Sequence, residues 1–215
     1  MPNLFVTATG TDLGKTHVAA ALVRELVRRG RPVDVLKPVL SGFDDPAASD
    51  AGRLLEALGR PLSELDRISP LRFSAPLAPP SAARAEDRSL MAEDLIALCR
   101  DRMDQDALLL IEGAGGVMSP LAEDATNLDI IAALGTPVLL VTGSYLGAIS
   151  HALTAIVALR SRDVSIAAIV VSESEGEPPP LDEILNGLAR FAPGIAVFIA
   201  PRRESFDASP LADAL

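Results

Sequence analysis

Residues 4–20, LFVTATGTDLGKTHVAA, join a short apolar run to a turn with two glycines and the start of a helical pattern. Gly10 and Gly14 allow backbone N–H groups to turn toward an anion, and the first turn of a following helix adds unpaired N–H groups. In this arrangement Lys15 would reach terminal phosphates, and the hydroxyl of Thr16 would bind a magnesium ion. The stretch therefore predicts a phosphate-binding P-loop.

The spacing departs from the strict pattern G-x-x-x-x-G-K-S/T, which would place its first glycine at Thr9. A spacing longer by one residue would place it at Ala8, and Gly10 is expected to supply the flexibility instead. The alternative is a turn that merely joins a strand to a helix. The GKT sequence at the start of the helical pattern argues against that alternative.

A second candidate segment begins at Lys37, which ends a predicted strand. Residues 38–50 follow as a polar segment rich in Gly, Ser, Asp and Pro, and they include Ser41. This segment is expected to be a loop, and loops after strands carry the sites of open α/β sheets. Considered alone, a Lys-Pro pair is more often an exposed lysine before a proline, but Ser41 and the P-loop favour a role for Lys37 in the site.

Two carboxylates are candidate magnesium ligands together with Thr16. Glu112 ends the apolar run at residues 107–111, where an unpaired carboxylate would be costly, so a cation partner is expected. That cation is either magnesium, which prefers hard oxygen ligands, or a lysine. Asp50 is either a third ligand or the cap of the helix that starts there.

Composition excludes several classes of protein. The chain has 215 residues, a net charge of −10 and one cysteine, which rules out an internal disulfide and argues against nonspecific binding to nucleic acid or anionic lipid. The apolar residues never run for about twenty positions, as a membrane span needs, and the first strand leaves no room for a signal peptide, so a cytoplasmic location is expected. Cys99, His17 and His151 fall in helical patterns and are interpreted as structural.

Strand and helix patterns alternate along the chain. Strands are expected near residues 4–6, 32–37, 107–111, 137–142, 165–171 and 195–199, and helices near 15–29, 50–58, 90–103, 127–134, 147–160 and 181–190. Residues 59–88 are expected to be mostly irregular and rich in proline. The alternation predicts a single α/β domain over residues 1–215, with a mostly parallel central sheet covered by helices on both faces, of the P-loop NTPase type.

Four motifs in this order resemble those of the dethiobiotin synthetase family of P-loop enzymes. They are TGTDLGKT at residues 9–16, KPV at 37–39 with Ser41-Gly42, EGAGG at 112–116 with Pro120-Leu121, and Leu146-Gly147 with Ile149 and His151. The resemblance covers residues 4 to about 172. It implies an ATP-dependent, Mg²⁺-dependent ligase.

The reaction implied by the resemblance closes a ring. Carbon dioxide forms a carbamate on one amine of 7,8-diaminopelargonic acid, ATP phosphorylates the carbamate, and the second amine displaces phosphate. The products are dethiobiotin, ADP and phosphate. Lys15 would neutralise the triphosphate and Lys37 would meet the carbamate and the transferring phosphoryl group, while Thr11 and Ser41 would hydrogen-bond the amine or carbamate.

The resemblance also implies three sets of binding residues and a homodimer, because in the family the region around Gly147 contacts substrate bound mainly by the other subunit. The nucleotide set is Gly10, Thr11, Asp12, Leu13, Gly14, Lys15, Thr16, His17, Ser172 and Pro201. The substrate set is Thr11, Lys37, Ser41, Glu112, Gly113, Ala114, Gly115, Leu146, Gly147 and Ser150. The magnesium set is Thr16, Asp50 and Glu112.

The chain departs from the family pattern at two places. Ser150 stands where asparagine is frequent, and Tyr145 stands where a smaller or basic residue is common. Ser172-Glu173 replaces an Asn-Asp pair that reads adenine, and a serine lacks the paired donor and acceptor of an amide. We therefore predict relaxed nucleotide choice, with ATP used and other nucleoside triphosphates accepted.

Two other kinds of P-loop protein are alternatives. A partition-type ATPase switch would carry an additional lysine early in the P-loop, and residues 9–13 contain none. An amidoligase of the cobyrinate-diamide type would need space for a glutaminase domain, which 215 residues do not provide. The ligase is therefore the preferred hypothesis.

Overall fold

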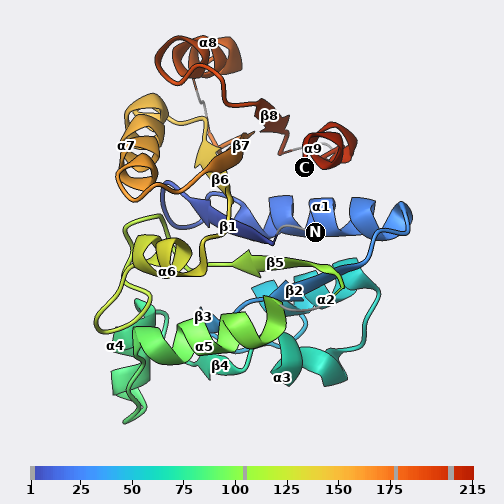
Figure 1. The fold of residues 1–215 in the computed structure, drawn as a ribbon, viewed down its shortest axis with the longest axis vertical. Helices are drawn as coiled ribbons and strands as arrows, with labels where there is room; N and C mark the ends of the chain where they lie inside the picture. Colours follow the sequence, from blue (N-terminus) through green and yellow to red (C-terminus); the bar gives the residue numbers. More distant parts are fainter. Residues whose placement is uncertain (1–2, 104–105, 177–178, 203–205) are drawn as a thin grey trace.

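A six-stranded parallel sheet forms the centre of the computed structural model, which describes residues 3–103, 106–176, 179–202 and 206–215. The order across the sheet is β2-β5-β1-β6-β7-β8 (Figure 1). The strands are β1 (Leu4–Ala8), β2 (Val33–Leu36), β5 (Leu108–Glu112), β6 (Val138–Gly143), β7 (Ile166–Ser172) and β8 (Val197–Ala200). Three inner strands, β1, β5 and β6, are buried along their whole length, as their apolar sequences predict.

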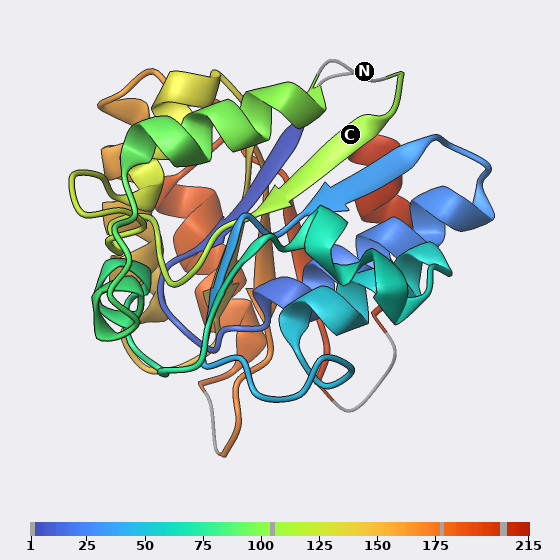
Figure 2. The same cartoon turned by 90° about the horizontal axis from the view of Figure 1, so that it is seen from below.

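Helices cover both faces of this sheet (Figures 1 and 2). The helices are α1 (Lys15–Arg28), α2 (Asp50–Leu58), α3 (Leu65–Ile68), α4 (Pro79–Ala85), α5 (Ala92–Met103), α6 (Asn127–Leu134), α7 (Ala148–Arg160), α8 (Leu181–Phe191) and α9 (Ser209–Ala214). Along β1, Phe5 packs with α4 to α8, whereas Leu4 and Val6 pack with α1, α2, α3 and α9. The predicted fold class is confirmed. Across the described ranges, no helix is long and apolar enough to cross a bilayer.

Residues 38–88 are more ordered than their sequence predicts. A second, two-stranded parallel sheet pairs β3 (Val39–Ser41) with β4 (Leu71–Phe73). The prediction of a loop over residues 38–50 is therefore wrong for the residues of β3. A 3-10 turn (Leu62–Glu64), α3 and α4 also interrupt the stretch expected to be irregular. Three-residue strands are too short to show an alternating pattern, and these two are defined by their pairing with each other, with Val39 and Phe73 buried.

Proline does not prevent order in this region. Pro79 and Pro80 occupy the first turn of α4, where a missing N–H costs no intrahelical hydrogen bond. The guanidinium of Arg88 lies 4.7 Å from the ring centroid of Phe73 and covers its outer side. The backbone N–H of Lys37 donates to the carbonyl of Ile68 at 2.7 Å, so this region supports the end of β2 directly.

Cys99 of α5 is completely buried in the core between α5 and the sheet. Burial raises the pKa of its thiol to about 12. A neutral, inaccessible thiol behaves as a small apolar side chain, which confirms its interpretation as structural.

Candidate active site

The predicted site segments all leave the same edge of the sheet, because its strands are parallel and their carboxyl ends lie together. Residues 9–14 follow β1, Lys37 follows β2, Glu112 ends β5 and Ser172 ends β7. The arrows of β2 and β5 point the same way in Figure 2. Leu36 of β2 is paired with Ile111 of β5, so the next residues along the two strands are Lys37 and Glu112. This edge is the candidate active site.

The strand, turn and helix predicted for the P-loop are present. Gly14 caps α1 with a φ of 83°, a left-handed conformation that favours glycine, and no side chain caps this helix. A Cβ at Gly14 would lie 2.7 Å from Oγ of Ser172, and a Cβ at Gly116 would lie 3.0 Å from the backbone N of Gly10. Both glycines therefore permit close packing, and the first amides of α1 stay available to an anion.

A buried ion pair lies next to the P-loop. Lys37 is 2% exposed and Glu112 is fully buried, and Nζ of Lys37 donates to Oε1 of Glu112 at 2.6 Å. The same ammonium lies 3.1 Å from Oδ2 of Asp50 and donates to the carbonyl of Gly113 at 3.0 Å. Thr16 Oγ1 donates to Oε1 of Glu112 at 2.8 Å, which joins the pair to the first turn of α1.

The charges of this cluster hold one another ionised. Burial disfavours the charged form of Lys37, but the carboxylates of Glu112 and Asp50 outweigh it and raise the pKa of the ammonium. Burial also disfavours the charged Asp50, yet Lys37 and the Thr16 hydroxyl lower the pKa of this carboxyl. For Lys15, burial and the nearby charge of Lys37 both lower the pKa. The pKa of each lysine therefore depends on the other charges of the same cluster.

The donor atoms fit a magnesium ion. Oε1 of Glu112 is bonded to Lys37, whereas Oε2 is buried without a hydrogen-bond partner. The ion pair with the lysine therefore leaves one carboxylate oxygen for a metal ion. Asp50 does not cap α2, since Ser49 Oγ accepts from the Gly52 N–H at 3.1 Å, and the cap alternative is wrong. Two carboxylates and the Thr16 hydroxyl suit magnesium, which keeps waters and takes further oxygens from phosphates.

A hollow of about 550 Å³ extends from the P-loop toward β7 and the chain after β8. Its lining residues include Asp12, Leu13, Gly14, His17, Ser172 and Pro201 of the predicted nucleotide set. His17 is exposed, so its interpretation as a packed structural residue is wrong; an exposed position on the first turn of a helix leaves its ring facing this hollow. The volume is of the size that small-molecule sites commonly have.

The second glycine-rich turn lies beside the P-loop. A Cβ at Gly115 would lie 3.7 Å from Thr11 Oγ1, so these two predicted substrate residues are neighbours. Gly113 contributes its carbonyl to Lys37, and the Ala114 carbonyl accepts from Asn127 Nδ2 at 2.7 Å. Asn127 also bonds the Gly116 and Ser119 carbonyls, so it fixes the turn. Ser41 lies half-buried at the end of β3.

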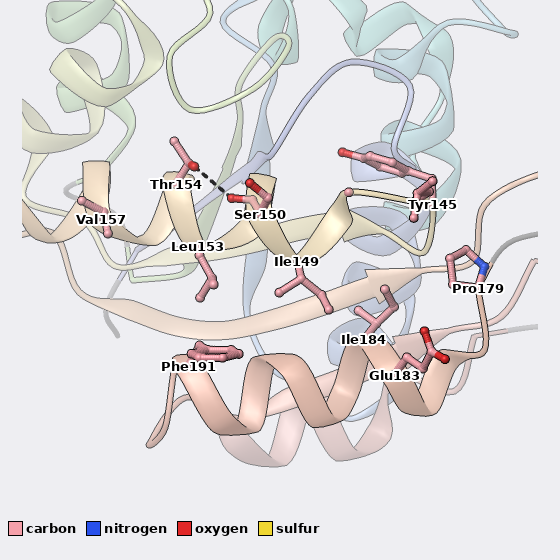
Figure 3. A pocket seen from close by; sticks show the side chains of 12 residues that line it. Tyr145, Ile149, Ser150, Leu153, Thr154, Val157, Pro179, Glu183, Ile184 and Phe191 are labelled. Atoms are coloured by element: carbon pink, nitrogen blue, oxygen red, sulfur yellow. Dashed lines mark hydrogen bonds between the residues drawn. The ribbon is translucent and has the colours of Figure 1, made fainter.

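The remaining predicted substrate residues lie elsewhere on the same chain. Leu146, Gly147 and Ser150 line an apolar groove of about 720 Å³ between α7 and α8 (Figure 3). The Tyr145 hydroxyl lies 2.7 Å from Nδ1 of the exposed His151, and this histidine lines a separate hollow that reaches Gly10 and Gly116. The groove is thus not part of the charged cluster within one chain.

Two residues of the site were missed by sequence reasoning. In the sequence, Asn127 is only a polar residue at the start of a predicted helix. In the structure its side chain is buried, where it bonds the second glycine-rich turn. Arg53 of α2 lines the P-loop hollow and was not among the predicted site residues. Its signal was the spacing from Asp50, because residues three apart share a helix face.

The parallel sheet, its order and the glycine turn leading into α1 define a nucleotide-binding α/β protein of the P-loop class. A family model described as an AAA domain matches residues 2–195. The solved structure of the signal recognition particle receptor FtsY from Elizabethkingia anophelis in complex with GDP resembles the chain with a TM-score of 0.50 at 14% identity, covering 100% of this chain and 63% of that one. This likeness concerns the fold alone.

The curated relatives are more specific. The ATP-dependent dethiobiotin synthetase BioD of Caulobacter sp. strain K31 is 57% identical over 219 residues, covering 100% of this chain and 94% of its own. The proteins of the same name from Caulobacter vibrioides strain NA1000 and Phenylobacterium zucineum strain HLK1 are each 54% identical and cover 100% of this chain and 99% and 95% of their own. The chain therefore belongs to the dethiobiotin synthetase family. The switch and amidoligase alternatives are not favoured.

The buried cluster makes a testable prediction about stability. Lys37→Met leaves the buried Glu112 carboxylate without its cation, and we expect the free energy of unfolding to fall by about 3 kcal/mol or more. Adding Glu112→Gln should recover part of this loss, because the uncompensated charge is then removed. Urea unfolding of the wild type, both single variants and the double variant measures the coupling. Strictly additive losses would contradict it.

Proposed function

We propose that this protein is an ATP-dependent, Mg²⁺-dependent dethiobiotin synthetase acting on 7,8-diaminopelargonic acid and carbon dioxide. The observation that carries the proposal is the Lys37 ammonium, held at the sheet edge by Glu112 and Asp50 beside the first turn of α1. Full-length identity to relatives named for this activity supports it. ATP is a cytoplasmic metabolite, and we place the reaction in the cytoplasm.

The proposed chemistry has three bond-forming steps. One amine nitrogen attacks carbon dioxide and loses a proton, which gives a carbamate. A carbamate oxygen then attacks the γ-phosphorus of ATP while ADP leaves, which gives a carbamic-phosphoric anhydride. The second amine attacks the carbonyl carbon of this anhydride and loses a proton, phosphate leaves, and the ureido ring closes.

The side chains support these steps by placing positive charge between two anions. A carbamate and a triphosphate repel each other, so bringing them in line requires fixed cations rather than an acid or a base. Lys15, at the start of α1, is assigned to the terminal phosphates, and Lys37 to the carbamate and the transferring phosphoryl group. Thr11, beside Gly115, is assigned to the amine or carbamate together with Ser41.

Magnesium would be held by Thr16, Asp50 and Glu112, and when bound it supplies charge neutralisation to the β- and γ-phosphates. Glu112 Oε2 is the buried oxygen still open to it. The nucleotide is assigned to the hollow lined by Gly14, His17, Ser172 and Pro201.

We also propose a homodimer in which the α7–α8 region of one copy completes the substrate site of the other. Leu146 is 90% exposed, Val157 67% and Phe191 60%, and all three line the same groove. Figure 3 places Leu153 of α7 opposite Phe191 of α8, and Ile149 of α7 next to Ile184 of α8. A large exposed apolar surface of this kind is usual at an interface, and a second copy would bring the Gly147 region to substrate.

The activity is tested with purified protein, 7,8-diaminopelargonic acid, bicarbonate, Mg²⁺ and ATP. We expect dethiobiotin by mass spectrometry and phosphate release that depends on the diamine. Lys37→Met should abolish ring closure because no other described ammonium lies in this position, while ADP binding by the same preparation verifies that the variant is folded. Equal phosphate release without the diamine would contradict the proposal.

Nucleotide choice is predicted to be relaxed, since Ser172 Oγ lies against Gly14 and Glu173 Oε2 accepts from the Arg202 N–H at 2.9 Å. Neither side chain offers an amide to the base. We expect turnover with CTP and GTP within about tenfold of that with ATP at matched concentrations. Ser172→Asn, which adds a paired donor and acceptor, should shift the choice toward ATP. A preference for ATP above about a hundredfold in the wild type would refute this prediction.

The dimer makes a separate prediction. Val157→Asp places a charge on the exposed α7 face, and we expect a monomer in analytical ultracentrifugation with strongly reduced turnover and unchanged ADP binding. Leu62→Asp is the matched control, because Leu62 is also exposed but lies outside the groove. A wild-type protein that is monomeric at assay concentrations would rule out the composite site.

A further inference from the structure

Arg53 of α2 is an exposed cation with no assigned role in the reaction. It lines the 550 Å³ hollow and also a smaller one of about 250 Å³ that reaches Lys15, Thr16 and Asp50. We propose that Arg53 is a phosphate-binding residue that contacts the nucleotide phosphates next to the first turn of α1. The proposal rests on nucleotide binding at the P-loop, which is part of the proposed function.

The position of Arg53 is fixed by the start of its helix. Asp50, three residues earlier on the same face, is tied to Lys37, and Ser49 caps the helix. Gly52 allows the preceding loop to close on α2, because a Cβ there would lie 2.2 Å from the Pro46 carbonyl oxygen. The first turn of α2 is therefore anchored to the P-loop cluster, and Arg53 follows it at the rim.

The guanidinium of Arg53 is also available to a ligand. In the residues that the structure describes, its guanidinium makes no hydrogen bond or ion pair, whereas Arg60, Arg67 and Arg102 all pair with the buried Asp34. The guanidinium of Arg202, on the far side of the hollow, is paired with Glu175. An exposed arginine at the rim of a phosphate site, with its N–H donors unused, can bind phosphate oxygens in a bidentate manner.

The charge balance of the site calls for such a residue. The P-loop cluster contains two lysines against three carboxylates, namely Lys15 and Lys37 against Asp12, Asp50 and Glu112. A triphosphate and a carbamate add several more negative charges, and a magnesium ion compensates only two. Arg53 supplies a further positive charge without displacing any existing bond.

The proposal is tested by calorimetric titration of the full-length protein with ADP and with adenosine, each in the presence of Mg²⁺. Arg53→Gln should weaken ADP binding about tenfold and leave adenosine binding unchanged, because only the phosphates lose a partner. Arg53→Lys keeps the charge and should lose less. In turnover, Arg53→Gln should raise the KM for ATP more than it lowers kcat.

Arg24→Gln is the matched control, because Arg24 is exposed on α1 but lines neither hollow. It should bind ADP like the wild type. Equal ADP affinity of Arg53→Gln and wild type, or an equal loss for adenosine, would overturn the proposal. Loss of ADP affinity in a protein that makes no dethiobiotin would refute the proposed function and leave the role of Arg53 intact.

Discussion

The buried ion pair between Lys37 and Glu112 is the constraint on which the rest of the site depends. Neither charge has more than 2% of its surface in water, so each requires the other and the surrounding oxygens to remain ionised. The pair joins the ends of two neighbouring strands, Asp50 adds α2, and Thr16 adds α1. One electrostatic cluster therefore sets the relative positions of four elements, and a shift of any of them would leave a buried charge uncompensated.

Close backbone packing provides the second constraint. The P-loop and the second glycine-rich turn touch at Gly10 and Gly116, where a side chain would meet backbone atoms at about 3 Å. Asn127 then holds the second turn by donating to three carbonyls. A buried amide with these bonds is costly to replace, because an apolar side chain would remove the donor of the Ala114 carbonyl and weaken the bonding of the Gly116 and Ser119 carbonyls, which also accept from backbone N–H groups. The glycines allow the two loops to approach closely, and Asn127 fixes the conformation of the second glycine-rich turn.

Sequence reasoning predicted the elements whose signal is local. The unbroken apolar run of β5 and the GKT sequence at α1 indicated a parallel sheet and a P-loop, and both are present. It failed at β3 and β4, because three-residue strands pair only through tertiary contacts. It treated magnesium and lysine as alternative partners of Glu112, although a carboxylate has two oxygens and can bind one cation with each. It overlooked Arg53, whose significance depends on the space in front of α2 rather than on any motif.

The overall charge of −10 opposes the approach of anionic substrates, so binding must come from short-range groups. The amides of α1 are available, but Lys37 is already held by two carboxylates. These carboxylates are also the oxygens proposed for a divalent cation. If the two carboxylates bind a divalent cation, Lys37 loses its closest anions, and its ammonium becomes available to another anion. Charge balance would thus make Lys37 ready for a second anion only once the nucleotide site is filled, an order that suits a reaction in which phosphoryl transfer follows nucleotide binding.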